Sequence, residues 1–352
     1  MPDHRVAFRH AMAALTDAEH GVISSLDEIG AVGHRVVHGG EKFAEAVVID
    51  DEVQRAIEQF SELAPLHNPP NLTGIRACKE LLPQVTQVAV FDTAFHQSMP
   101  PHAYLYGLPF EIYRDRQVRR YGFHGTSHRY VALRAAEFLA DTGVPAYEQK
   151  IITCHLGNGC SMTAVLGGKS VDTTMGMTPL EGLLMGTRCG DLDPAIVIFL
   201  MEHLGMDRDE ADDLLNKHSG LLGVSGVGSD MRDIHRAAEA GNERAALALD
   251  IFCYRVRKYI GAYSAVLGGL DALVFTGGIG ENDARVRACS VEGLEHLGLL
   301  VDPARNEAPQ FEDDIASVGL ADAAANMLVI RTDEELMIAR DTVRLLEGAA
   351  RD

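Results

Sequence analysis

The sequence lacks a long hydrophobic run, a paired-cysteine motif and an excess of positive charge. No stretch of about 18 apolar residues occurs, so we expect no membrane span. A formal net charge of −20 argues against binding to nucleic acid or to an anionic membrane. The opening residues, MPDHRVAFRHAM, lack the apolar core of a signal peptide. The six cysteines have no CxxC spacing, which is typical of reduced thiols, and we expect a cytoplasmic protein.

Three common nucleotide and hydrolase motifs are also missing or incomplete. No stretch matches GxGxxG, which weakens a dinucleotide-binding interpretation. No GxSxG occurs, so a hydrolase nucleophile elbow is unsupported. The segment AVLGGKS (164–170) ends like a Walker A loop, but Thr163 stands where that motif requires its first glycine.

The sequence has ordinary soluble composition, and its glycines gather in turns beside apolar runs. Its 352 residues, 47% hydrophobic and 23% charged, suffice for two domains. Residues 151–154 and 162–166 read as two strands joined by a turn at Gly157-Asn158-Gly159. Such a turn can aim N–H groups at an anion, although an ordinary hairpin turn is the alternative. A strand, glycine turn and helix pattern, each a candidate phosphate contact, is predicted at 151–167, 219–235 and 272–290.

Cationic side chains occur beside several glycines of this acidic chain, which suggests an anionic ligand. Arg35 lies in the stretch HRVVHGG and Arg188 in the stretch GTRCG; both guanidinium groups suit carboxylate or phosphate. His124 lies between two glycines ahead of a helix predicted over 129–140, where packing gives little reason for an imidazole. Ser127 is predicted to cap that helix. A zinc pair from the two histidines flanking Arg35 is disfavoured because no third ligand has useful spacing.

Asp92 directly follows a predicted buried strand, residues 88–91. Functional side chains of open α/β sheets sit at the carboxyl ends of strands, although Asp92 could equally cap the next turn. The segment APLHNPPN (64–71) contains too much proline for a helix or a central strand and is predicted as a rigid turn. Asp193 before Pro194 is assigned to helix capping. Helices are predicted over 4–20, 51–63, 194–204 and, with one continuous apolar stripe, 243–267.

An ordered series of stretches covering nearly the whole chain resembles the acetate kinase family. These stretches are VGHRVVHGG (32–40), APLHNPPN (64–71), FDTAFH (91–96), YGFHGTSH (121–128), HLGNG (155–159), GTRCGDLDPA (186–195), SDMRD (229–233), FTGGIGEN (275–282) and TDEEL (332–336). The resemblance implies an α/β, two-lobed actin/hexokinase-like (ribonuclease H-like) fold with the active site in the cleft between the lobes. It also implies a homodimer and direct, in-line, reversible phosphoryl transfer from ATP to acetate, giving ADP and acetyl phosphate, with Mg2+ or alternatively Mn2+.

The resemblance also assigns roles to residues of this sequence. Arg35 and Arg188 would hold the carboxylate and the transferring phosphoryl group, His124 would steady the transition state, and Asp92 would take acid/base or positioning work. Glu334 would help to hold Mg2+. The methyl pocket would consist of Val37, Leu66 and Pro179. The nucleotide would contact His155, Leu156, Gly157, Asn158, Gly159, Asp230, Met231, Arg232, Gly278, Ile279, Gly280, Glu281 and Asn282.

Elementary chemistry supports most of these assignments. Phosphoryl transfer needs positioning and charge neutralisation, which arginines, a histidine and Mg2+ supply. Acetate is already ionised near neutral pH, so a general base is unnecessary. We therefore expect Asp92 to orient an arginine, a metal ion or water. Everything depends on Arg35, His124 and Arg188 meeting in one crevice that faces the glycine turns.

The sequence departs from the family pattern at its start. Family members begin with a strand–turn–strand unit carrying an Asn-Cys-Gly-Ser-Ser-Ser-type loop, and we expect the first lobe here to be truncated. A misplaced start codon and a truly shortened chain are the two explanations. The first lobe is predicted as residues 1–94 plus 333–352, and the second, which would bind nucleotide and dimerise, as 95–332. Propionate or butyrate kinase activity, or a catalytically impaired truncated homologue, are the alternative functions.

Overall fold

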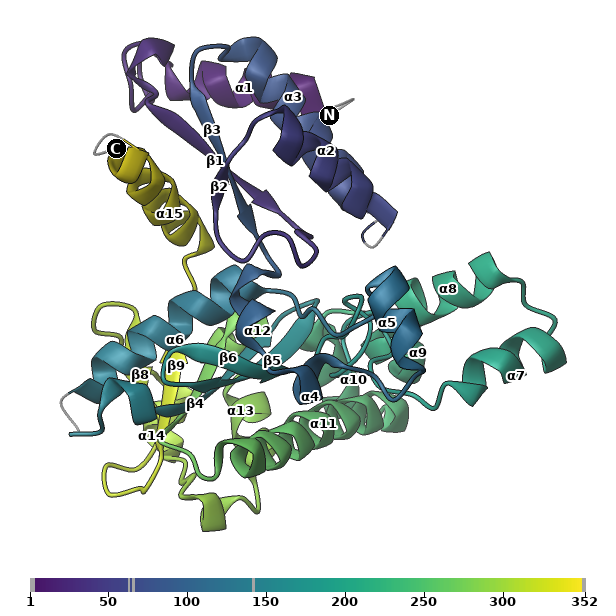
Figure 1. Cartoon of the computed structure of the whole chain (residues 1–352). Helices are drawn as coiled ribbons and strands as arrows, with labels where there is room; N and C mark the ends of the chain where they lie inside the picture. The colour runs from purple at the N-terminus through teal and green to yellow at the C-terminus, as the bar shows by residue number, and fades with distance from the viewer. Residues whose placement is uncertain (1–3, 63, 65–66, 141–142, 350–352) are drawn as a thin grey trace. The chain divides into compact units, whose positions relative to one another are not determined.

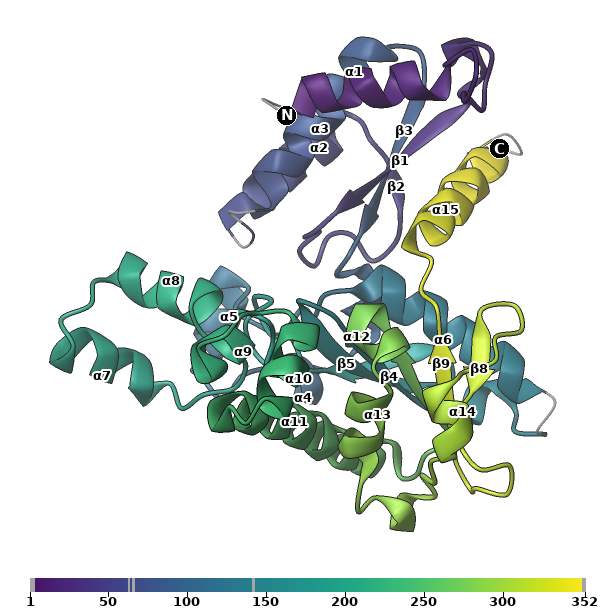
Figure 2. The same cartoon turned by 180° about the vertical axis from the view of Figure 1, so that it is seen from behind.

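The computed structural model describes residues 4–62, 64, 67–140 and 143–349. The chain forms two compact units, which are described separately below (Figures 1 and 2). Unit 1 contains residues 1–97 and 333–352, and unit 2 contains residues 98–332. Both units combine a β-sheet with helices, so the predicted α/β class is confirmed. None of the described helices combines the length and apolar character needed to cross a membrane.

Unit 1 is built on a three-stranded sheet with the order β1-β3-β2. Strand β1 (Ala31–Val36) runs parallel to β3 (Thr86–Phe91), and β2 (Val47–Val48) runs antiparallel to β3. Its helices are α1 (His4–Leu15), η1 (Leu26–Glu28), α2 (Asp51–Gln59), η2 (Phe60–Glu62), α3 (Asn68–Leu81) and α15 (Glu334–Ala349). Helix α15 joins the unit from the far end of the sequence, and η3 (Ala94–Ser98) follows β3.

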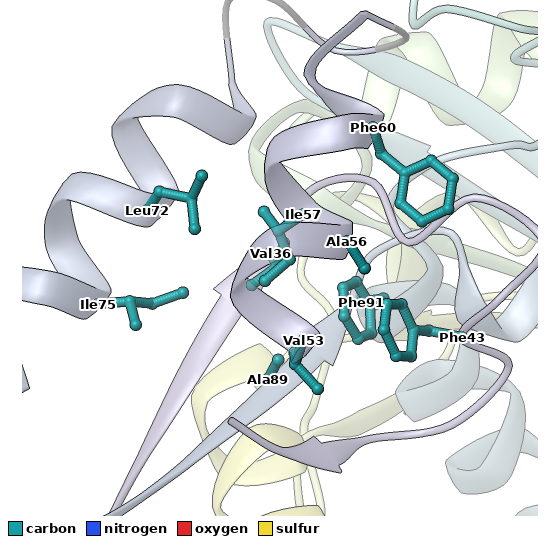
Figure 3. Close-up of a cluster of buried hydrophobic side chains, with 10 residues drawn as sticks. All are labelled: Val36, Phe43, Val53, Ala56, Ile57, Phe60, Leu72, Ile75, Ala89 and Phe91. Atoms are coloured by element: carbon teal, nitrogen blue, oxygen red, sulfur yellow. The ribbon is translucent and has the colours of Figure 1, made fainter. Parts of the chain in front are cut away.

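The core of unit 1 fills the space between the sheet and helices α2 and α3 (Figure 3). Its centre is a stacked pair of rings, Phe43 and Phe91, whose centroids are 4.6 Å apart. The remaining buried members are Val36, Val53, Ala56, Ile57, Phe60, Leu72, Ile75 and Ala89. A second cluster places Ile338 and Leu345 of α15 against Val88 and Val90. Because side chains of a strand alternate between the two faces, residues of β3 serve both clusters and the sheet is covered on both sides.

The proline-rich segment is not the simple turn that its composition suggests. Helix α3 begins at Asn68 and takes Pro69 and Pro70 into its first turn, so the prediction of no helix there was wrong. Proline fits this position because the first N–H groups of a helix have no intrahelical acceptor. The buried Asn68 side chain donates to the carbonyls of His38 and Ile57 and accepts from the His38 N–H. The helix start thereby holds the turn that follows β1.

Unit 2 is built on a six-stranded sheet with the order β6-β5-β4-β7-β9-β8. The strands are β4 (Lys150–Leu156), β5 (Cys160–Leu166), β6 (Lys169–Thr173), β7 (Ala272–Thr276), β8 (Ile315–Ser317) and β9 (Asn326–Ile330). Strands β4, β7 and β9 are parallel, and β5, β6 and β8 are antiparallel to their neighbours. The carboxyl ends of β4, β7 and β9 therefore share one edge, where ligands of α/β sheets bind.

Two long helices cover the sheet of unit 2. Helix α6 (Gly125–Leu139) packs on β4, β7 and β9, and α11 (Glu243–Leu267) packs on β4 and β5, on the opposite side (Figures 1 and 2). The other helices are α4 (Pro101–Tyr104), α5 (Phe110–Arg116), η5 (Ala146–Glu148), α7 (Ala195–His203), α8 (Arg208–Lys217), α9 (Gly220–Ser225), α10 (Met231–Glu239), α12 (Gly277–Asn282), α13 (Ala284–Val291), η6 (Glu295–Leu297) and α14 (Pro303–Glu307). The helix predicted over 243–267 is α11, and its predicted apolar stripe is buried, so both predictions are confirmed.

Three sequence predictions for unit 2 need correction. The two strands predicted over 151–154 and 162–166 around a turn are confirmed, so the strand, turn and helix pattern also assigned to 151–167 was wrong in its helix. The segment at 219–235 contains no strand: Ser219 precedes α9 in an extended conformation, and Gly226 ends that helix in the left-handed region with a φ of 69°. Helix α6 begins at Gly125, not at 129, so Ser127 lies inside its first turn and cannot be its N-cap.

Candidate active site

The carboxyl ends of β1 and β3 bring two predicted site residues of unit 1 together. The Asp92 N–H donates to the Val36 carbonyl at 2.9 Å, which prolongs the ladder between the two strands. An Arg35 guanidinium nitrogen (Nη2) donates to Asp92 Oδ2 at 2.7 Å. Asp92 is only 1% exposed, whereas the Arg35 side chain is 40% exposed. The buried carboxylate therefore fixes an arginine whose outer surface stays accessible.

Glu334 completes this charged group from the first residue of α15. Burial raises the pKa of Glu334, the Asp92 carboxylate raises it further, and Arg35 lowers it. The charge of Asp92 raises the pKa of Arg35, with a smaller contribution from Glu334. Two neighbouring carboxylates repel each other, and a cation would relieve that repulsion.

The Asp92 and Glu334 pair fits a magnesium ion. Mg2+ is usually held by one or two carboxylates together with substrate phosphates and water. In the described part of the chain, no group of three or more His, Cys, Asp or Glu side chains could hold a metal ion by itself. Glu334 was predicted as the metal residue and Asp92 as a residue that orients an arginine, a metal ion or water; their charge interaction shows that the two carboxylates lie near each other in unit 1.

In unit 2, His124 is fixed by its backbone and by two ring contacts. Its φ of 55° places it in the left-handed region at the start of α6. The ring stacks on His155 with centroids 4.3 Å apart, and its Nδ1 is 2.8 Å from Ser161 Oγ. Consequently the opposite edge of the imidazole, which carries Nε2, faces away from Ser161.

That edge meets Arg188 at the glycine turn between β4 and β5. A Cβ atom added to Gly159 would lie 3.4 Å from His124 Nε2 and 3.6 Å from Arg188 Nη1. Arg188 Nη1 donates to the Pro179 carbonyl at 3.1 Å. Two predicted catalytic side chains and one predicted nucleotide turn therefore converge on one point of unit 2.

Arg188 differs from Arg35 in having no acidic partner among the residues that the structure describes. No carboxylate within the described ranges forms an ion pair with it, and burial lowers its pKa. A half-buried guanidinium in this state gains free energy when an anion binds, because the anion supplies the missing countercharge. Arg188 is thus suited to a phosphoryl or carboxylate group that arrives with a substrate.

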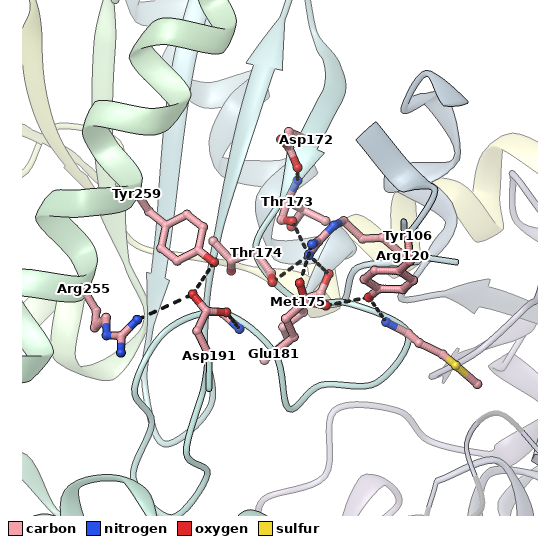
Figure 4. Close-up of polar contacts among 12 residues, drawn as sticks. Tyr106, Arg120, Asp172, Thr173, Thr174, Met175, Glu181, Asp191, Arg255 and Tyr259 are labelled. Carbon is pink, nitrogen blue, oxygen red and sulfur yellow. Dashed lines mark hydrogen bonds and ion pairs between the residues drawn. The ribbon is translucent and has the colours of Figure 1, made fainter. Parts of the chain in front are cut away.

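The long loop that carries Arg188, between β6 and α7, is anchored by polar side chains (Figure 4). Arg120 donates to the carbonyls of Thr173, Thr174 and Met175 and pairs with Glu181. Tyr106 donates to the same Glu181 carboxylate and accepts from the Met177 N–H. These bonds order a loop that has no helix or strand of its own.

A second anchor lies nearer to α7. Tyr259 on α11 donates to Asp191 at 2.7 Å, and the Gly182 N–H donates to the other Asp191 oxygen at 2.9 Å. Asp193 accepts from the Ala195 N–H at 2.9 Å, but α7 begins at Ala195 with Pro194 as its N-cap, so the prediction of Asp193 as the N-cap was wrong by one residue. Arg188 therefore stands between two fixed points of the loop.

A thiol also lies in the glycine turn. The fully buried Cys160 donates to the Gly157 carbonyl, with the sulfur 3.1 Å from the oxygen. Burial raises the pKa of this thiol to about 12, although the Gly157 contact and Arg188 act in the opposite direction. Cys160 is therefore a packing residue with a weak hydrogen bond and no thiolate character.

Three predicted nucleotide segments line one pocket of unit 2, about 540 Å³ in volume. The predicted lining residues are Gly157, Asn158, Asp230, Met231, Arg232, Gly278, Ile279 and Asn282. Met231 and Ile279 supply apolar surface, while the glycines and the polar side chains line the rest of the pocket. This combination suits a nucleotide, which has a flat base at one end and phosphates at the other.

The other predicted nucleotide residues are not among those that line the pocket. Glu281 accepts from the Gly277 and Thr332 N–H groups, so its carboxylate holds the turn after β7. Leu156 and Gly280 are buried, His155 is bonded to Ser127 at 2.8 Å, and Gly159 lies beside His124.

Sequence reasoning missed two lining residues, Ser229 and Asp283. Asp283 caps α13 through Val286 and binds His235 of α10 at 2.7 Å, which links two walls of the pocket. Its position directly before a helix was a capping signal that could have been recognised. Nothing local to the sequence pairs it with His235.

The predicted methyl pocket is not assembled by contacts within either unit. Val37 is buried in unit 1 and its N–H donates to Asn71, whereas Pro179 belongs to unit 2. Leu66 lies outside the described residues. This pocket stays a prediction.

A glycine turn and the start of α12 line a pocket at the carboxyl edge of the sheet, and two basic side chains, His124 and Arg188, converge on the same turn. This arrangement is typical of α/β enzymes that bind phosphate groups. A sequence model of the Acetokinase family matches residues 1–340, and the chain belongs to this family.

Individual relatives agree. The acetate kinase of Desulfitobacterium hafniense (strain DSM 10664 / DCB-2) is 58% identical over 347 residues, which are 99% of this chain and 86% of the relative. The acetate kinase of Methanosarcina acetivorans is 58% identical over 347 residues, 99% of this chain and 84% of the relative.

Solved structures extend the match to the fold. The Porphyromonas gingivalis acetate kinase superimposes with a TM-score of 0.92 at 49% identity, covering 98% of this chain and 86% of the other. A propionate kinase from Francisella tularensis gives 0.88 at 43% identity, covering 97% and 84%. The predicted family is confirmed. The predicted loss of an N-terminal segment is not confirmed by these comparisons.

Proposed function

We propose that this protein is an acetate kinase that transfers the terminal phosphoryl group of ATP to acetate. An acetate oxygen bonds to the γ-phosphorus as the bond from that phosphorus to the bridging oxygen breaks, which gives acetyl phosphate and ADP. The reaction is reversible. The observation that carries the proposal is the convergence of His124 and Arg188 on the turn at Gly159, which adjoins a pocket lined by the predicted nucleotide segments.

Each group has a distinct task in this proposal. Arg188 neutralises the transferring phosphoryl group, because its guanidinium has no acidic partner in the described chain and its pKa is lowered by burial. His124 Nε2 adds a hydrogen bond to the same group. Arg35 orients the acetate carboxylate, and the ion pair between Arg35 and Asp92 holds the guanidinium group in place.

No residue needs to remove a proton from acetate, because the carboxylate is the nucleophile. Asp92 therefore acts through Arg35 and the metal ion rather than as a general base. When Mg2+ is bound, it neutralises charge on the nucleotide phosphates. Asp92 and Glu334 would hold it, with the phosphates supplying further oxygens.

A propionate kinase is the second candidate, and the likeness to the Francisella tularensis propionate kinase favours keeping it. One methylene is worth only about 1–3 kcal/mol of discrimination in an apolar pocket, so a small change in the lining decides the substrate.

One assay separates these functions. The purified full chain is incubated with ATP, Mg2+ and acetate, propionate or butyrate in parallel, and hydroxylamine traps the acyl phosphate as a hydroxamate. An acetate kinase gives the highest kcat/KM with acetate, and a propionate kinase gives it with propionate. Absence of hydroxamate with all three acids would contradict both and leave a catalytically impaired homologue.

We also propose a homodimer formed through α7. This helix exposes apolar side chains that an isolated unit would leave in water, among them Ile198 at 57% and Phe199 at 54% exposure. With α8 it projects from the rest of unit 2 (Figure 1). A paired substitution, Ile198→Glu with Phe199→Asp, should convert a dimer to a monomer in light scattering. An unchanged dimer mass would exclude α7 as the interface.

We place the protein in the cytoplasm. All six cysteines are free thiols, and Cys78, Cys154, Cys160 and Cys253 are buried. Reduced thiols of this kind are typical of proteins in a reducing compartment.

A further inference from the structure

A chain of hydrogen bonds runs from the sheet of unit 2 to His124. Thr153 Oγ1 on β4 is 2.7 Å from His128 Nδ1. His128 Nε2 is 2.7 Å from Ser161 Oγ on β5, and Ser161 Oγ is 2.8 Å from His124 Nδ1. Thr153, His128 and Ser161 are all fully buried. The two hydroxyl groups each contribute one hydrogen, so the direction of the chain can be worked out.

The direction follows from Thr153. Its hydroxyl has no hydrogen-bond partner other than His128 Nδ1 in the part of the chain that the structure describes. A buried hydroxyl that donates to nothing costs about 1–3 kcal/mol, so the Thr153 hydrogen points at His128 Nδ1. His128 Nδ1 is then the acceptor, and in the uncharged ring the hydrogen sits on Nε2.

Following the hydrogens along the chain of bonds gives the tautomer of His124 as well. His128 Nε2–H donates to Ser161 Oγ, so the Ser161 hydrogen is available for its other neighbour, His124 Nδ1. His124 Nδ1 accepts this hydrogen, and uncharged His124 therefore carries its own hydrogen on Nε2. Nε2 is the atom on the edge that faces the Gly159 turn and Arg188.

We infer that Ser161 is a positioning residue. By accepting a hydrogen bond from His128 and donating one to His124 Nδ1, it fixes His124 as an Nε2–H donor. Its hydroxyl joins the two imidazoles, and its side chain is fully buried. With the reverse order, His124 would present a bare nitrogen to an anionic phosphoryl group, which would repel it. The inference rests on the proposed function for its catalytic meaning, whereas the tautomer is a property of the protein alone.

The first test measures the tautomer directly. Full-length protein labelled with 15N-histidine is examined by long-range 15N–1H correlation at alkaline pH without substrates, and His124 is assigned by the signal lost in His124→Gln. The expected spectrum shows a protonated Nε2 and a bare Nδ1. A protonated Nδ1 on uncharged His124 would overturn the inference, whether or not the protein proves to be an acetate kinase.

The second test uses Ser161→Ala, with Thr163→Val as the matched control. Thr163 lies two residues along the same strand, is equally buried, and bonds Thr173 rather than a histidine. Ser161→Ala should lower kcat about 10- to 100-fold with little change in either KM, as for removal of a group that orients a functional histidine. It should also remove the preference of His124 for Nε2–H. Thr163→Val should leave kcat and the tautomer unchanged.

Ser161→Thr completes the set because it keeps the hydroxyl. It should recover a large part of the kcat lost in Ser161→Ala, which a purely structural role of the side chain volume would not predict. Wild-type kcat in Ser161→Ala would overturn the inference. If wild-type protein forms no acyl phosphate, the proposed function fails, and the spectrum of the wild-type protein still decides the tautomer.

Discussion

The two arginines predicted to bind substrate anions lie in opposite electrostatic surroundings. Arg35 in unit 1 is paired with Asp92, and its pKa is raised by that carboxylate. Arg188 in unit 2 is held by the neutral Pro179 carbonyl, and burial lowers its pKa. One residue type thus serves two purposes. Arg35 is oriented in advance by a fixed partner, whereas the charge of Arg188 stays available for an anionic substrate group.

The difference teaches how charge is distributed over this acidic protein. Unit 1 gathers two carboxylates and one arginine, which suits a metal ion and an oriented carboxylate substrate. Unit 2 relies on backbone turns, helix starts and an arginine without an acidic partner in the described chain, which suits phosphate. Substitutions in each unit should consequently disturb different kinetic constants.

The largest effect is expected for Arg188→Gln. Loss of the charge that faces the transferring group should lower kcat/KM about 10²- to 10³-fold, the range for removal of one transition-state donor. The hydroxamate assay measures it. Arg208→Gln serves as the control, because Arg208 is exposed and paired with Asp209. If Arg188→Gln were as active as the control, the proposal that Arg188 binds the transferring phosphoryl group would be wrong.

Asp92→Asn should have the next largest effect. The substitution keeps the shape of the side chain but removes the charge that raises the pKa of Arg35. We expect kcat to fall about 10- to 100-fold, as for other residues that orient a functional group. Steady-state kinetics at saturating Mg2+ measure the change. Near-normal turnover together with unchanged Mg2+ dependence would show that Asp92 orients neither Arg35 nor the metal ion.

Glu334→Gln should change the metal requirement and its pH dependence. The pKa of Glu334 is raised above its ordinary 4.5, so protons compete with Mg2+ as pH falls toward that raised value. The Mg2+ concentration for half-maximal rate should therefore rise as pH is lowered in the wild type. In Glu334→Gln it should be high and nearly independent of pH over the same window.

Glu335→Gln is the matched control for that measurement, because Glu335 is the next residue and is exposed. Its charge makes the smallest of the contributions that raise the pKa of Glu334, so this variant should keep the wild-type Mg2+ requirement with its pH dependence displaced only slightly. If Glu334→Gln kept the wild-type Mg2+ requirement and pH profile, the proposed metal site in unit 1 would be wrong.

The smallest effect is expected for Gly186→Ala, which tests the close packing of unit 2. A Cβ atom at this position would lie 2.1 Å from Asn158 Oδ1, so the Asn158 side chain must move out of its place in the predicted nucleotide pocket. The KM for ATP should rise several-fold, with stability little changed. Gly261→Ala in α11 has open space around its Cβ position and should instead stabilise the protein by about 0.5–1 kcal/mol without altering the KM. Equal KM values would show that Asn158 is not a nucleotide contact.

Periodicity and local motifs predicted much of the fold. The apolar stripe of α11 and the buried runs of β3, β4, β7 and β9 were recognisable because every residue on one face carries the same signal. The errors arose where one local sequence signal has two structural interpretations. Pro69 and Pro70 were counted against a helix whose first turn accepts them, and Ser127 was taken for a cap when the helix begins earlier.

The candidate site was predictable only as a set of side chains. The glycine turns and Arg188 stand out in the sequence because their residue types are unusual in packing roles. The bonds from Ser161 to His124 and from Asp283 to His235 were not predictable, since each joins residues far apart in the chain through an unremarkable residue type. Partners of this kind are set by the sheet order and by helix placement, which only the folded structure provides.

The buried thiol at Cys160 has a practical consequence for the chemistry of the cell. Since this sulfur hardly ionises near neutral pH, peroxides and disulfides, which react with thiolates, find no target in the turn that adjoins Arg188. Oxidative stress would have to unfold the sheet before it could disable this turn through sulfur.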